Sequence, residues 1–434
     1  MNSLNNSCYF TPVPSRRISE NGRVEFRIAS KSAKTVDVSA SFPDGTQKFI
    51  GGFPLKSNFE LTKIYPDTKG ILGMFDWVLE FRDSHGDILD TQVQNYEIVA
   101  SSVHSTCLLD GCWISVRHWS PVESRYFKDG LEEMTDDDWK EHVYQMHKIG
   151  ITTVLIQNMF DTDSPHYHVC EHSMSADTYE GEAYYDSSVY PRRRPGMKEV
   201  DPLEAILTAA DECGMAVFPG VGIYAMFDFS PDSLEWHKRV AKEYIERYGH
   251  HKSFYGFYIS EEIFGYLYYD CPYAPNELYK DIQDFFREFR SFAHDLAPTK
   301  PVALAPSNVD MHKYPEEWGG ILENLDILIP FGFARSPNNV AEIIKMCKDY
   351  DTHFWCDLEI FQFPFDNGAL IPKDIDALIR EIHDYDALEQ IYGYQFTGLL
   401  NEPGKNKYNL GRKDTEDLYA GYYEYQRKVR GLDE

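Results

Sequence analysis

Residues 254–262, FYGFYISEE, predict a buried β-strand that ends in two adjacent glutamates. A carboxylate costs free energy inside a protein core unless it has a partner, so its place at the end of such a strand needs an explanation. Side chains alternate along a strand, which puts Ser260 and Glu262 on one face and Glu261 on the other. The apolar residues on the face of Glu261 favour packing under helices, and this leaves Glu262 pointing inward.

A strand-like run followed by an amphipathic run is repeated from Trp113 to the end of the chain. The strand-like runs are residues 112–119, 152–160, 215–224, 254–262, 301–307, 325–333, 353–363 and 391–400. The amphipathic runs are residues 136–150, 201–214, 234–249, 277–296, 316–325, 338–350, 373–388 and 414–431. Eight such pairs over about 320 residues predict a (β/α)8 TIM barrel, in which the loops after the strands build the site. An open doubly wound sheet is the alternative, but no G-x-G-x-x-G follows the first strand and the sequence has no P-loop.

The N-terminal part of the chain has a different pattern, of short β-rich runs separated by turn signals such as FPDG and SHGD. The runs are residues 23–30, 35–42, 47–53, 59–65, 75–83 and 91–99. We expect an all-β sandwich with one wet face on each sheet over residues 1–108, followed by the barrel over residues 109–434. In composition this part resembles the immunoglobulin-like sandwiches that precede many glycosidase barrels.

Composition restricts the classes of function. A formal net charge of −28 on 434 residues would repel the phosphate backbone of a nucleic acid, so we expect no nucleic-acid partner. No apolar run approaches the roughly 18 residues of a membrane span, and the N-terminus shows no secretory signal, which predicts a cytoplasmic protein with no membrane partner. The cysteines have no framework spacing and are predicted to be reduced. An aromatic content of 15% favours stacking on a sugar ring.

Polar side chains follow most of the predicted strands, at the end that would face the catalytic mouth of a barrel. They are Arg117 and His118 after the first strand, Gln157 and Asn158 after the second, Ser260, Glu261 and Glu262 after the fourth, Ser307 and Asn308 after the fifth, Arg335 after the sixth, Asp357 and Glu359 after the seventh, and Gln395, Asn401 and Glu402 after the eighth. Asp357 and Glu359 share one face of their strand, with Glu359 nearer the mouth. Glu262 and Glu359 are therefore predicted as the catalytic pair, with Glu261 in reserve.

Two carboxylates are what the cleavage of a glycosidic bond requires. One protonates the departing oxygen while the other attacks or stabilises the oxocarbenium-like centre, and burial beside Tyr258 would raise the pKa of the acid. A plainer interpretation of the SEE motif is a helix N-cap with favourable first-turn charges. Similarly, Asn401 and Glu402 in LLNEP have the form of a catalytic pair while starting a loop.

The segments GFYISEEI and WCDLEIF, residues 256–263 and 355–361, resemble the pattern of a large clan of glycoside hydrolases. Barrels of that clan carry the acid/base on the fourth strand and the nucleophile on the seventh. More narrowly, residues from about 110 to 400 are similar to domain-of-unknown-function family 4434, glycosidase-like barrels whose fourth strand ends in a WYIPxE-like motif. The resemblance implies a retaining mechanism. Where the clan usually has Asn-Glu, this chain has Glu261-Glu262, so both glutamates remain candidates for the acid.

The other residues at the predicted mouth are assigned to substrate binding. Arg117 and Gln157 are expected to bind sugar hydroxyls. Candidates for sugar platforms are Trp119, Trp355, Phe361 and Tyr394, although ordinary packing is the plainer interpretation of each one taken singly. The predicted substrate-binding set is Arg117, His118, Trp119, Gln157, Asn158, Tyr258, Asn308, Arg335, Trp355, Asp357 and Gln395.

A second group of chemically versatile residues lies in DSPHYHVCEH, residues 163–172. Its alternating His166, His168, Cys170 and His172 are ligand types that suit zinc. Tetrahedral sites usually draw ligands from two separated elements, however, and no C-x-x-C accompanies this run. We therefore predict that residues 159–200 form a lid or subsite wall, and we expect neither a metal nor a cofactor in the catalytic site.

The sequence thus predicts a glycosidase that acts on a carbohydrate substrate with two carboxylates. A non-catalytic carbohydrate-binding barrel is the main alternative, and it would keep the aromatic walls but lose one carboxylate. A metal-dependent hydrolase is a third possibility, which the absence of an H-x-H motif at the end of the first strand disfavours.

Overall fold

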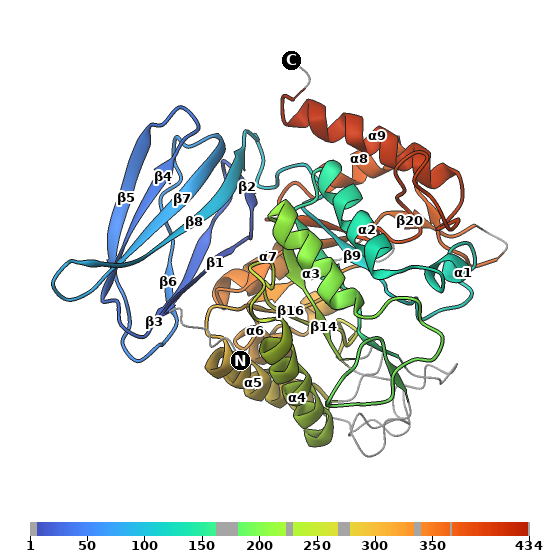
Figure 1. Cartoon of the computed structure of the whole chain (residues 1–434), viewed down its shortest axis with the longest axis horizontal. Helices are drawn as coiled ribbons and strands as arrows, with labels where there is room; N and C mark the ends of the chain where they lie inside the picture. Colours follow the sequence, from blue (N-terminus) through green and yellow to red (C-terminus); the bar gives the residue numbers. More distant parts are fainter. Residues whose placement is uncertain are drawn as a thin grey trace.

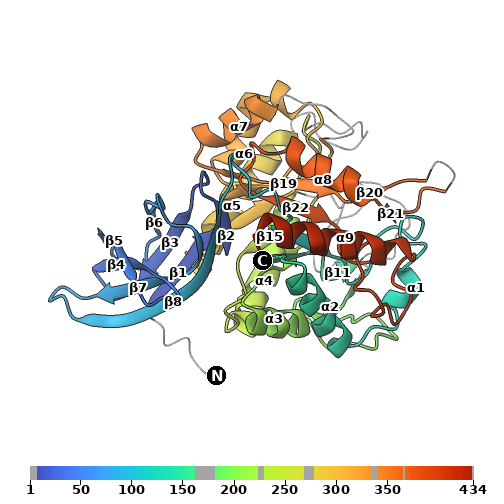
Figure 2. The same cartoon turned by 90° about the horizontal axis from the view of Figure 1, so that it is seen from above.

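The computed structural model describes residues 7–161, 181–222, 229–267, 278–333, 340–364 and 367–432. An N-terminal β region is followed by parallel strands that alternate with helices (Figure 1). In both views the N-terminal β region lies against the side of the parallel part that is remote from α1 and β20 (Figures 1 and 2). Among the described helices, none combines the length and the apolar character that crossing a membrane requires.

The N-terminal β region consists of two sheets that share one core. The first sheet has the order β1 (Cys8–Val13), β3 (Glu25–Ser30) and β6 (Thr62–Ile64). The second has the order β2 (Arg17–Ser19), β8 (Ile88–Val99), β7 (Gly73–Arg82), β4 (Thr35–Ser41) and β5 (Gln47–Pro54). Phe26 of the first sheet meets Trp77 of the second edge-to-face, with ring centroids 5.1 Å apart. The immunoglobulin-like topology of this region stays a prediction.

The predicted N-terminal strands are all present in the structure, and two further strands, β1 and β2, were not predicted. Their segment contains Pro12 and Pro14, residues that lack the N–H group of a strand ladder and so argue against a central strand. In the structure β1 is an edge strand that pairs with β3 alone, and an edge position tolerates proline.

The rest of the chain forms two five-stranded parallel sheets within the described residues. One has the order β13 (Ala216–Phe218), β10 (Thr153–Ile156), β9 (Gly111–Ile114), β22 (Ile391–Tyr394) and β19 (Cys356–Glu359). The other has the order β14 (Gly220–Val221), β15 (Phe257–Ile259), β16 (Val302–Leu304), β17 (Ile327–Leu328) and β18 (His353–Phe354). The segment 216–221 contains β13 of one sheet and β14 of the other, and the segment 353–359 contains β18 and β19 in the same way. The two sheets are therefore continuous with each other at both edges. We call this set of strands the strand ring.

Helices lie outside the strand ring, each between two of its strands in sequence (Figure 2). They are α2 (Asp136–Lys148), α3 (Pro202–Cys213), α4 (Pro231–Tyr248), α5 (Leu278–Leu296), α6 (Pro315–Leu322), α7 (Val340–Asp349) and α8 (Ile375–Asp384), followed by α9 (Asp414–Val429) after the last strand. The predicted amphipathic runs all appear, because their start signals are local. Thr135 and Asp138 form a reciprocal capping box at α2, and the side chains of Asp201 and Ser230 cap α3 and α4.

Shorter elements connect these main ones. They are α1 (Lys128–Leu131), η1 (Met311–Lys313), β11 (Phe160–Asp161) paired with β12 (Glu182–Ala183), and β20 (Phe361–Gln362) paired with β21 (Ile371–Pro372).

The interior of the strand ring is filled by side chains. They form one cluster, made of Val13, Trp113, Leu155, Ala216, Phe218, Tyr255, Tyr258, Ala303, Ala305, Ile327, Ile329, Trp355 and Tyr392. Neighbours in sequence such as Cys112, Val154 and Cys356 belong instead to the larger cluster that packs with the helices. This alternation shows which residues of each strand face inward. Val13 comes from β1, so the N-terminal β region contributes to the filling of the ring.

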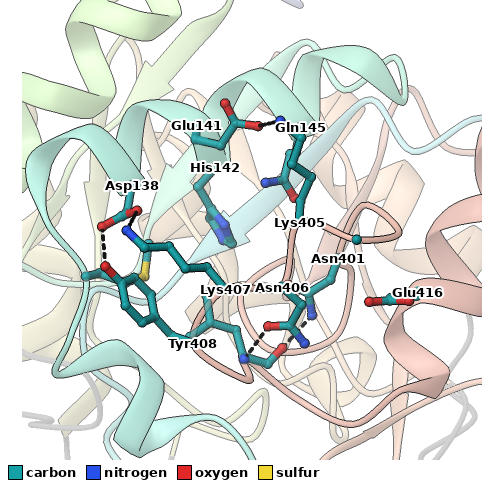
Figure 3. A pocket seen from close by; sticks show the side chains of 13 residues that line it. Asp138, Glu141, His142, Gln145, Asn401, Lys405, Asn406, Lys407, Tyr408 and Glu416 are labelled. Carbon is teal, nitrogen blue, oxygen red and sulfur yellow. Dashed lines mark hydrogen bonds and ion pairs between the residues drawn. The ribbon is translucent and has the colours of Figure 1, made fainter.

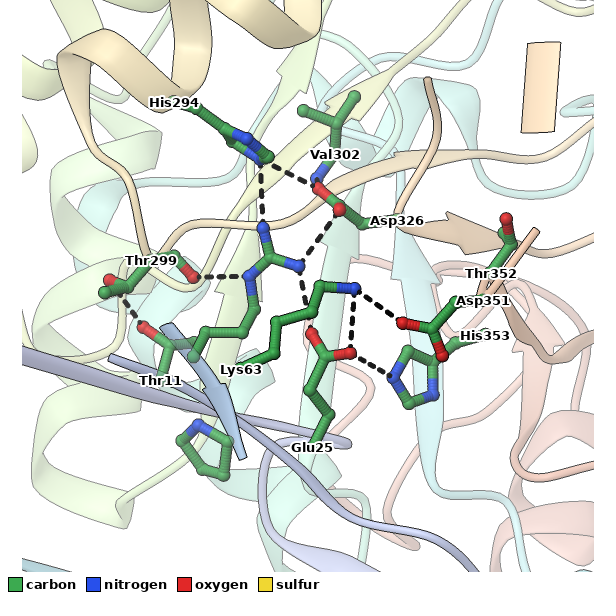
Figure 4. A network of polar contacts seen from close by, with 12 residues as sticks. Thr11, Glu25, Lys63, His294, Thr299, Val302, Asp326, Asp351, Thr352 and His353 are labelled. Atoms are coloured by element: carbon green, nitrogen blue, oxygen red, sulfur yellow. Dashed lines mark hydrogen bonds and ion pairs between the residues drawn. The ribbon is translucent and has the colours of Figure 1, made fainter. Parts of the chain in front are cut away.

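The N-terminal β region docks through buried charges on the amino-terminal end of the strand ring (Figure 4). Arg27 of β3 is fully buried and donates to Asp326 at 2.9 Å, to Glu25 at 3.1 Å and to the carbonyl of Thr299 at 3.0 Å. Because β3 is buried at every position, the prediction of one wet face per sheet is wrong for this sheet. The physical reason is that polar groups just before the ring strands, such as Asp326 and the carbonyl of Thr299, pair with the charged side chains on the second face of β3.

Candidate active site

Strand β19 carries two carboxylates on its interior face. Trp355 belongs to the interior cluster, whereas Cys356 and Leu358 belong to the outer one. Asp357 and Glu359 therefore lie on the interior side, at 6% and 8% exposure. Glu359 is one pleat nearer the carboxyl-terminal end of the strand, which is the end where the sequence predicts the mouth.

The two adjacent glutamates after strand β15 have different surroundings. Glu261 is fully buried, and its Oε1 lies 3.6 Å from Nε2 of His237, which belongs to α4 on the outside of the ring. Glu262 is half-buried. Tyr258, on the same strand, belongs to the interior cluster. The observed contact of Glu261 with α4 agrees with the alternation from which Glu262 is predicted to point inward.

Tyr258 links the two strands electrostatically. Burial raises the pKa of its phenol, and the charges of Asp357, Glu262 and Glu261 raise this pKa further, in that order. The ring of Tyr258 also meets Trp113 edge-to-face, with centroids 6.1 Å apart. The charges of Asp357 on β19 and of Glu261 and Glu262 after β15 thus all act on the ionisation of one phenol.

Beside these residues, the backbones of β10, β14 and β15 approach one another closely. A Cβ atom at Gly220 would lie 2.5 Å from the backbone oxygen of Gln157 and 2.5 Å from Oγ of Ser260, so only glycine fits. The Gln157 side-chain oxygen is buried and has no hydrogen-bond partner among the described residues. An amide oxygen in that state is suited to accept a hydrogen bond from a bound hydroxyl.

Arg117 and His118, after the first ring strand, are engaged with protein groups. Arg117 donates to Glu199 at 2.8 Å and to the carbonyl of Val116 at 2.7 Å, and it lies 3.3 Å from Glu132. Burial lowers the pKa of His118 to about 4, so the ring is neutral at pH 7. The half-buried Trp119 stacks on the His118 ring, with centroids 5.7 Å apart.

Several other predicted substrate-binding residues are also buried. Gln395 accepts from Ser115 Oγ at 2.5 Å and donates to the carbonyl of Thr397 at 2.8 Å. The amide of Asn158 donates to the carbonyl of Phe160 at 2.5 Å. Trp355 has no exposed surface and its indole lies 3.3 Å from Glu389, so its ring fills the core. Asn308 is fully buried, with Oδ1 next to the backbone of Gly332.

Asn401 and Glu402, from the segment after β22, lie at a different place. Asn401 lines a pocket of about 460 Å³ between α2 and the segment 401–410 (Figure 3). The charged side chains of its walls pair with one another, as Lys407 does with Asp138. Glu402 pairs with Lys148 of α2. Glu402 therefore connects the segment after β22 to α2, whereas the amide of Asn401 donates to Leu410 and Thr415.

Arg335 and the residues His166, His168, Cys170 and His172 lie outside the described residues. The structure also places at the site some residues that the sequence analysis left out of the substrate-binding set. Ser115 follows β9, Ser260 follows β15, and Tyr394 of β22 packs against the interior cluster. Burial of its phenol oxygen, followed by the charges of Glu123 and Asp357, raises the pKa of Tyr394. Ser260 and Tyr394 are among the residues that the sequence pattern indicates, and period-two counting from Trp113 would have added Ser115.

A family model described as a domain of unknown function, DUF4434, matches residues 109–407. The chain belongs to the DUF4434 family. The sequence-based prediction of this family is confirmed. The DUF4434 domain begins just before β9 and ends after β22, so it contains the whole strand ring together with Glu262 and Glu359.

Solved glycoside hydrolases resemble this DUF4434 protein in structure. A candidate alpha-L-fucosidase from Bacteroides thetaiotaomicron is 17% identical, with a TM-score of 0.52 over 75% of this chain and 94% of that chain. Beta-glucuronidases from Parabacteroides merdae and Bacteroides uniformis are 13% and 12% identical, with TM-scores of 0.40 and 0.44, over 96% and 97% of this chain. This chain covers 52% and 50% of those two enzymes, about half of their length. At such identities the likeness concerns the fold alone. No curated protein matches the sequence.

Proposed function

We propose that this DUF4434 protein is a glycoside hydrolase that cleaves an O-glycosidic bond by a retaining, two-carboxylate mechanism. In this proposal residues 109–434 form a closed (β/α)8 barrel, and residues 1–108 form a separate immunoglobulin-like sandwich. The observation that carries the proposal is that Asp357 and Glu359 lie on the interior side of β19, while the charges of Asp357, Glu262 and Glu261 all raise the pKa of Tyr258, an interior residue of β15. Acids whose charges act on the same group also repel one another, so their gathering favours a catalytic use.

In the proposed mechanism Glu262 is the acid/base and Glu359 is the nucleophile. Glu262 donates its proton to the glycosidic oxygen as the bond to the anomeric carbon breaks, while a Glu359 oxygen forms a bond to that carbon. Glu262, now ionised, then removes a proton from a water molecule that displaces Glu359 and releases the sugar. A separation of about 5 Å between the two carboxyl groups suits this double displacement.

The geometry gives the neighbouring residues distinct tasks. We assign Gln157, whose buried oxygen has no described partner, to a sugar hydroxyl, and we assign Asp357 and Asn308 to further hydroxyls deeper in the site. Trp119 is half-buried and is the better candidate for a sugar platform, because Trp355 has no accessible face. Arg117 is assigned to hold the segments that carry Glu199 and Glu132 beside the site.

The test is hydrolysis of a panel of aryl glycosides by the wild type and by the variants Glu262→Gln, Glu359→Gln and Glu261→Gln. We expect the first two to lose at least about a thousandfold in kcat/KM, because each removes a group that acts in the transition state. Glu261→Gln is the matched control. It changes the neighbouring glutamate, whose carboxylate faces α4, and should keep activity within about tenfold.

Two further outcomes separate the parts of the proposal. The product of the wild type should keep the anomeric configuration of the substrate when the reaction is followed by NMR, and added azide should restore turnover to Glu359→Ala with an inverted glycosyl azide as product. If both glutamine variants turn over every substrate as the wild type does, the assignment fails. If the wild type binds sugars but hydrolyses none, the protein is a carbohydrate-binding barrel instead.

A further inference from the structure

A cluster of metal-ligating side chains lies on the outside of the strand ring, away from the proposed catalytic carboxylates. It consists of Glu204 in α3 and of His250 and His251 in the turn after α4. One potential ligand atom from each residue lies within 4.8 Å of the other two. The three residues come from two separate elements, which is the arrangement that stable metal sites favour and that the run 163–172 lacks.

The ring of His251 is held in the orientation that a metal ligand needs. Its Nδ1 lies 2.8 Å from Oδ2 of Asp211, and the other oxygen of Asp211 accepts the backbone N–H of Ser253 at 2.7 Å. A histidine that binds a metal through one ring nitrogen usually donates the N–H of the other nitrogen to a carboxylate. This arrangement leaves Nε2 of His251 facing Glu204, at 3.2 Å.

The distances are close to those of a four-coordinate site. With metal–ligand bonds of about 2.0–2.2 Å, neighbouring ligand atoms in a tetrahedron lie roughly 3.4 Å apart. The separation of 3.2 Å between Glu204 and His251 fits this value. His250 is exposed and its ring centroid lies 4.2 Å from that of His251, so a change of its side-chain rotamer closes the remaining gap.

We propose that Glu204, His250 and His251 bind one zinc ion, with Asp211 as the carboxylate that orients His251. Two imidazoles and one carboxylate are ligands that Zn²⁺ accepts, whereas Ca²⁺ and Mg²⁺ prefer oxygen alone. The fourth position faces solvent and takes water. His250 and His251 also line a groove of about 580 Å³ against residues 90–94 of β8, which gives a small ligand access to that position.

The ion would connect α3 to the turn after α4 rather than take part in sugar chemistry. A protonated His251 between Asp211 and Glu204 would explain two of the contacts without any metal. It would give no role to His250, however, because neither carboxylate contact involves that residue. His250 is therefore the residue that distinguishes a metal site from an ion pair.

The experiment is titration of the metal-free full-length protein with Zn²⁺ by calorimetry and with Co²⁺ by visible absorption. We expect the wild type to bind one equivalent at this site and Co²⁺ to develop the d–d bands of low-symmetry nitrogen and oxygen ligation. His250 is exposed and Glu204 is partly exposed, so His250→Ala and Glu204→Gln should leave the fold intact. Each variant should weaken Zn²⁺ binding at least about tenfold. His85→Ala, an exposed histidine of the N-terminal β region, is the matched control and should bind as the wild type does.

A triple variant, His166→Ala/His168→Ala/His172→Ala, separates this site from the histidine-rich run. Retention of the bound equivalent in the triple variant, together with its loss in His250→Ala, supports the proposal. The proposal is overturned if the wild type binds no Zn²⁺ at 100 μM, about the limit of a meaningful protein site. It is equally overturned if His250→Ala binds as the wild type does, or if the triple variant alone abolishes binding.

Discussion

The two ends of the strand ring both bury charged side chains, but they do so in opposite ways. At the amino-terminal end, cations and anions are paired, and Arg27 lies between Glu25 and Asp326. His353 and Arg27 hold the pKa of Glu25 low against the effect of burial, and Arg27, Arg290 and His294 do the same for Asp326. At the carboxyl-terminal end, the acids Asp357 and Glu262 lie together around Tyr258, and burial and their charges raise the pKa of its phenol.

The difference shows how to separate structural charges from candidate functional ones. A buried charge with an opposite partner loses little free energy and fixes how two parts of the molecule dock. Buried charges of the same sign destabilise one another, so their retention calls for another explanation. Asp357 is buried, like the charges at the other end, so burial alone does not tell the two groups apart. The following predictions test this difference, the first two at the amino-terminal end and the third at both ends.

The largest expected loss of stability comes from removing the central cation at the amino-terminal end. Arg27→Met should lower the free energy of unfolding by about 3–5 kcal/mol, because Glu25 and Asp326 would remain buried after losing the one fully buried cation that they share. Urea denaturation followed by circular dichroism measures this change. The control is Arg82→Met, which breaks the partly exposed pairs with Asp37 and Glu80 and should lower the free energy of unfolding far less. Equal effects of the two variants would contradict the docking role of the buried network.

The second prediction concerns pH and His353, which begins strand β18 at the same end. Burial by itself lowers the pKa of this histidine, but Glu389 and Glu25 outweigh burial and raise the pKa to about 9. Because this folded-state pKa lies above the unfolded value of about 6.5, the protonated ring stabilises the protein fully below pH 6.5, and this contribution is lost as the pH rises through about 9. The loss should amount to at most about 3 kcal/mol.

Unfolding free energies at pH 6 and at pH 9.5, in the wild type and in His353→Gln, check this prediction. The wild type should lose more stability than the variant over this interval, since glutamine does not titrate. Parallel curves for the two proteins would show that His353 is not the titrating group.

The third and smallest expected effect compares a glycine at each end. A Cβ atom at Gly220 would lie 2.5 Å from the Gln157 carbonyl oxygen, and one at Gly256 would clash in the same way with the carbonyl oxygen of Pro301. Gly220→Ala and Gly256→Ala should each lower the free energy of unfolding by about 1–3 kcal/mol. Only Gly220→Ala should also lower kcat/KM of the folded protein, by about tenfold or more, because it displaces Ser260 beside the carboxylates. Equal kcat/KM values in the two variants would show that the active site does not lie beside Gly220.

Much of the secondary structure follows from local patterns. The amphipathic runs appear as α2 to α9, and the strand-like runs appear as shorter strands at the expected places. The alternation in FYISEE predicts different surroundings for Glu261 and Glu262, and the contact of Glu261 with His237 of α4 agrees with it. Such patterns are readable because a strand or helix repeats over two to four residues, a distance that a short sequence window contains.

Local sequence patterns predict the candidate site less well than they predict the secondary structure. Arg117 is a plausible sugar ligand in the sequence, but in the structure it pairs with Glu199, which lies 82 positions away. Gln395 likewise accepts from Ser115, 280 positions earlier in the chain. Partners at such separations meet only when the parallel strands assemble, so a list of polar residues after strands does not show which of them remain available to a substrate.

By itself the sequence determined the order of the elements, the family and the face on which each strand carries its carboxylates, because these depend on short-range periodicity and motif. The tertiary structure alone decided that Glu25 and Arg27 bind charges of the ring instead of water. It also decided that the acids of β15 and β19 act on one phenol. Both outcomes depend on segments brought together across hundreds of residues, where electrostatic and packing energies between distant parts of the chain, rather than local preferences, select the arrangement.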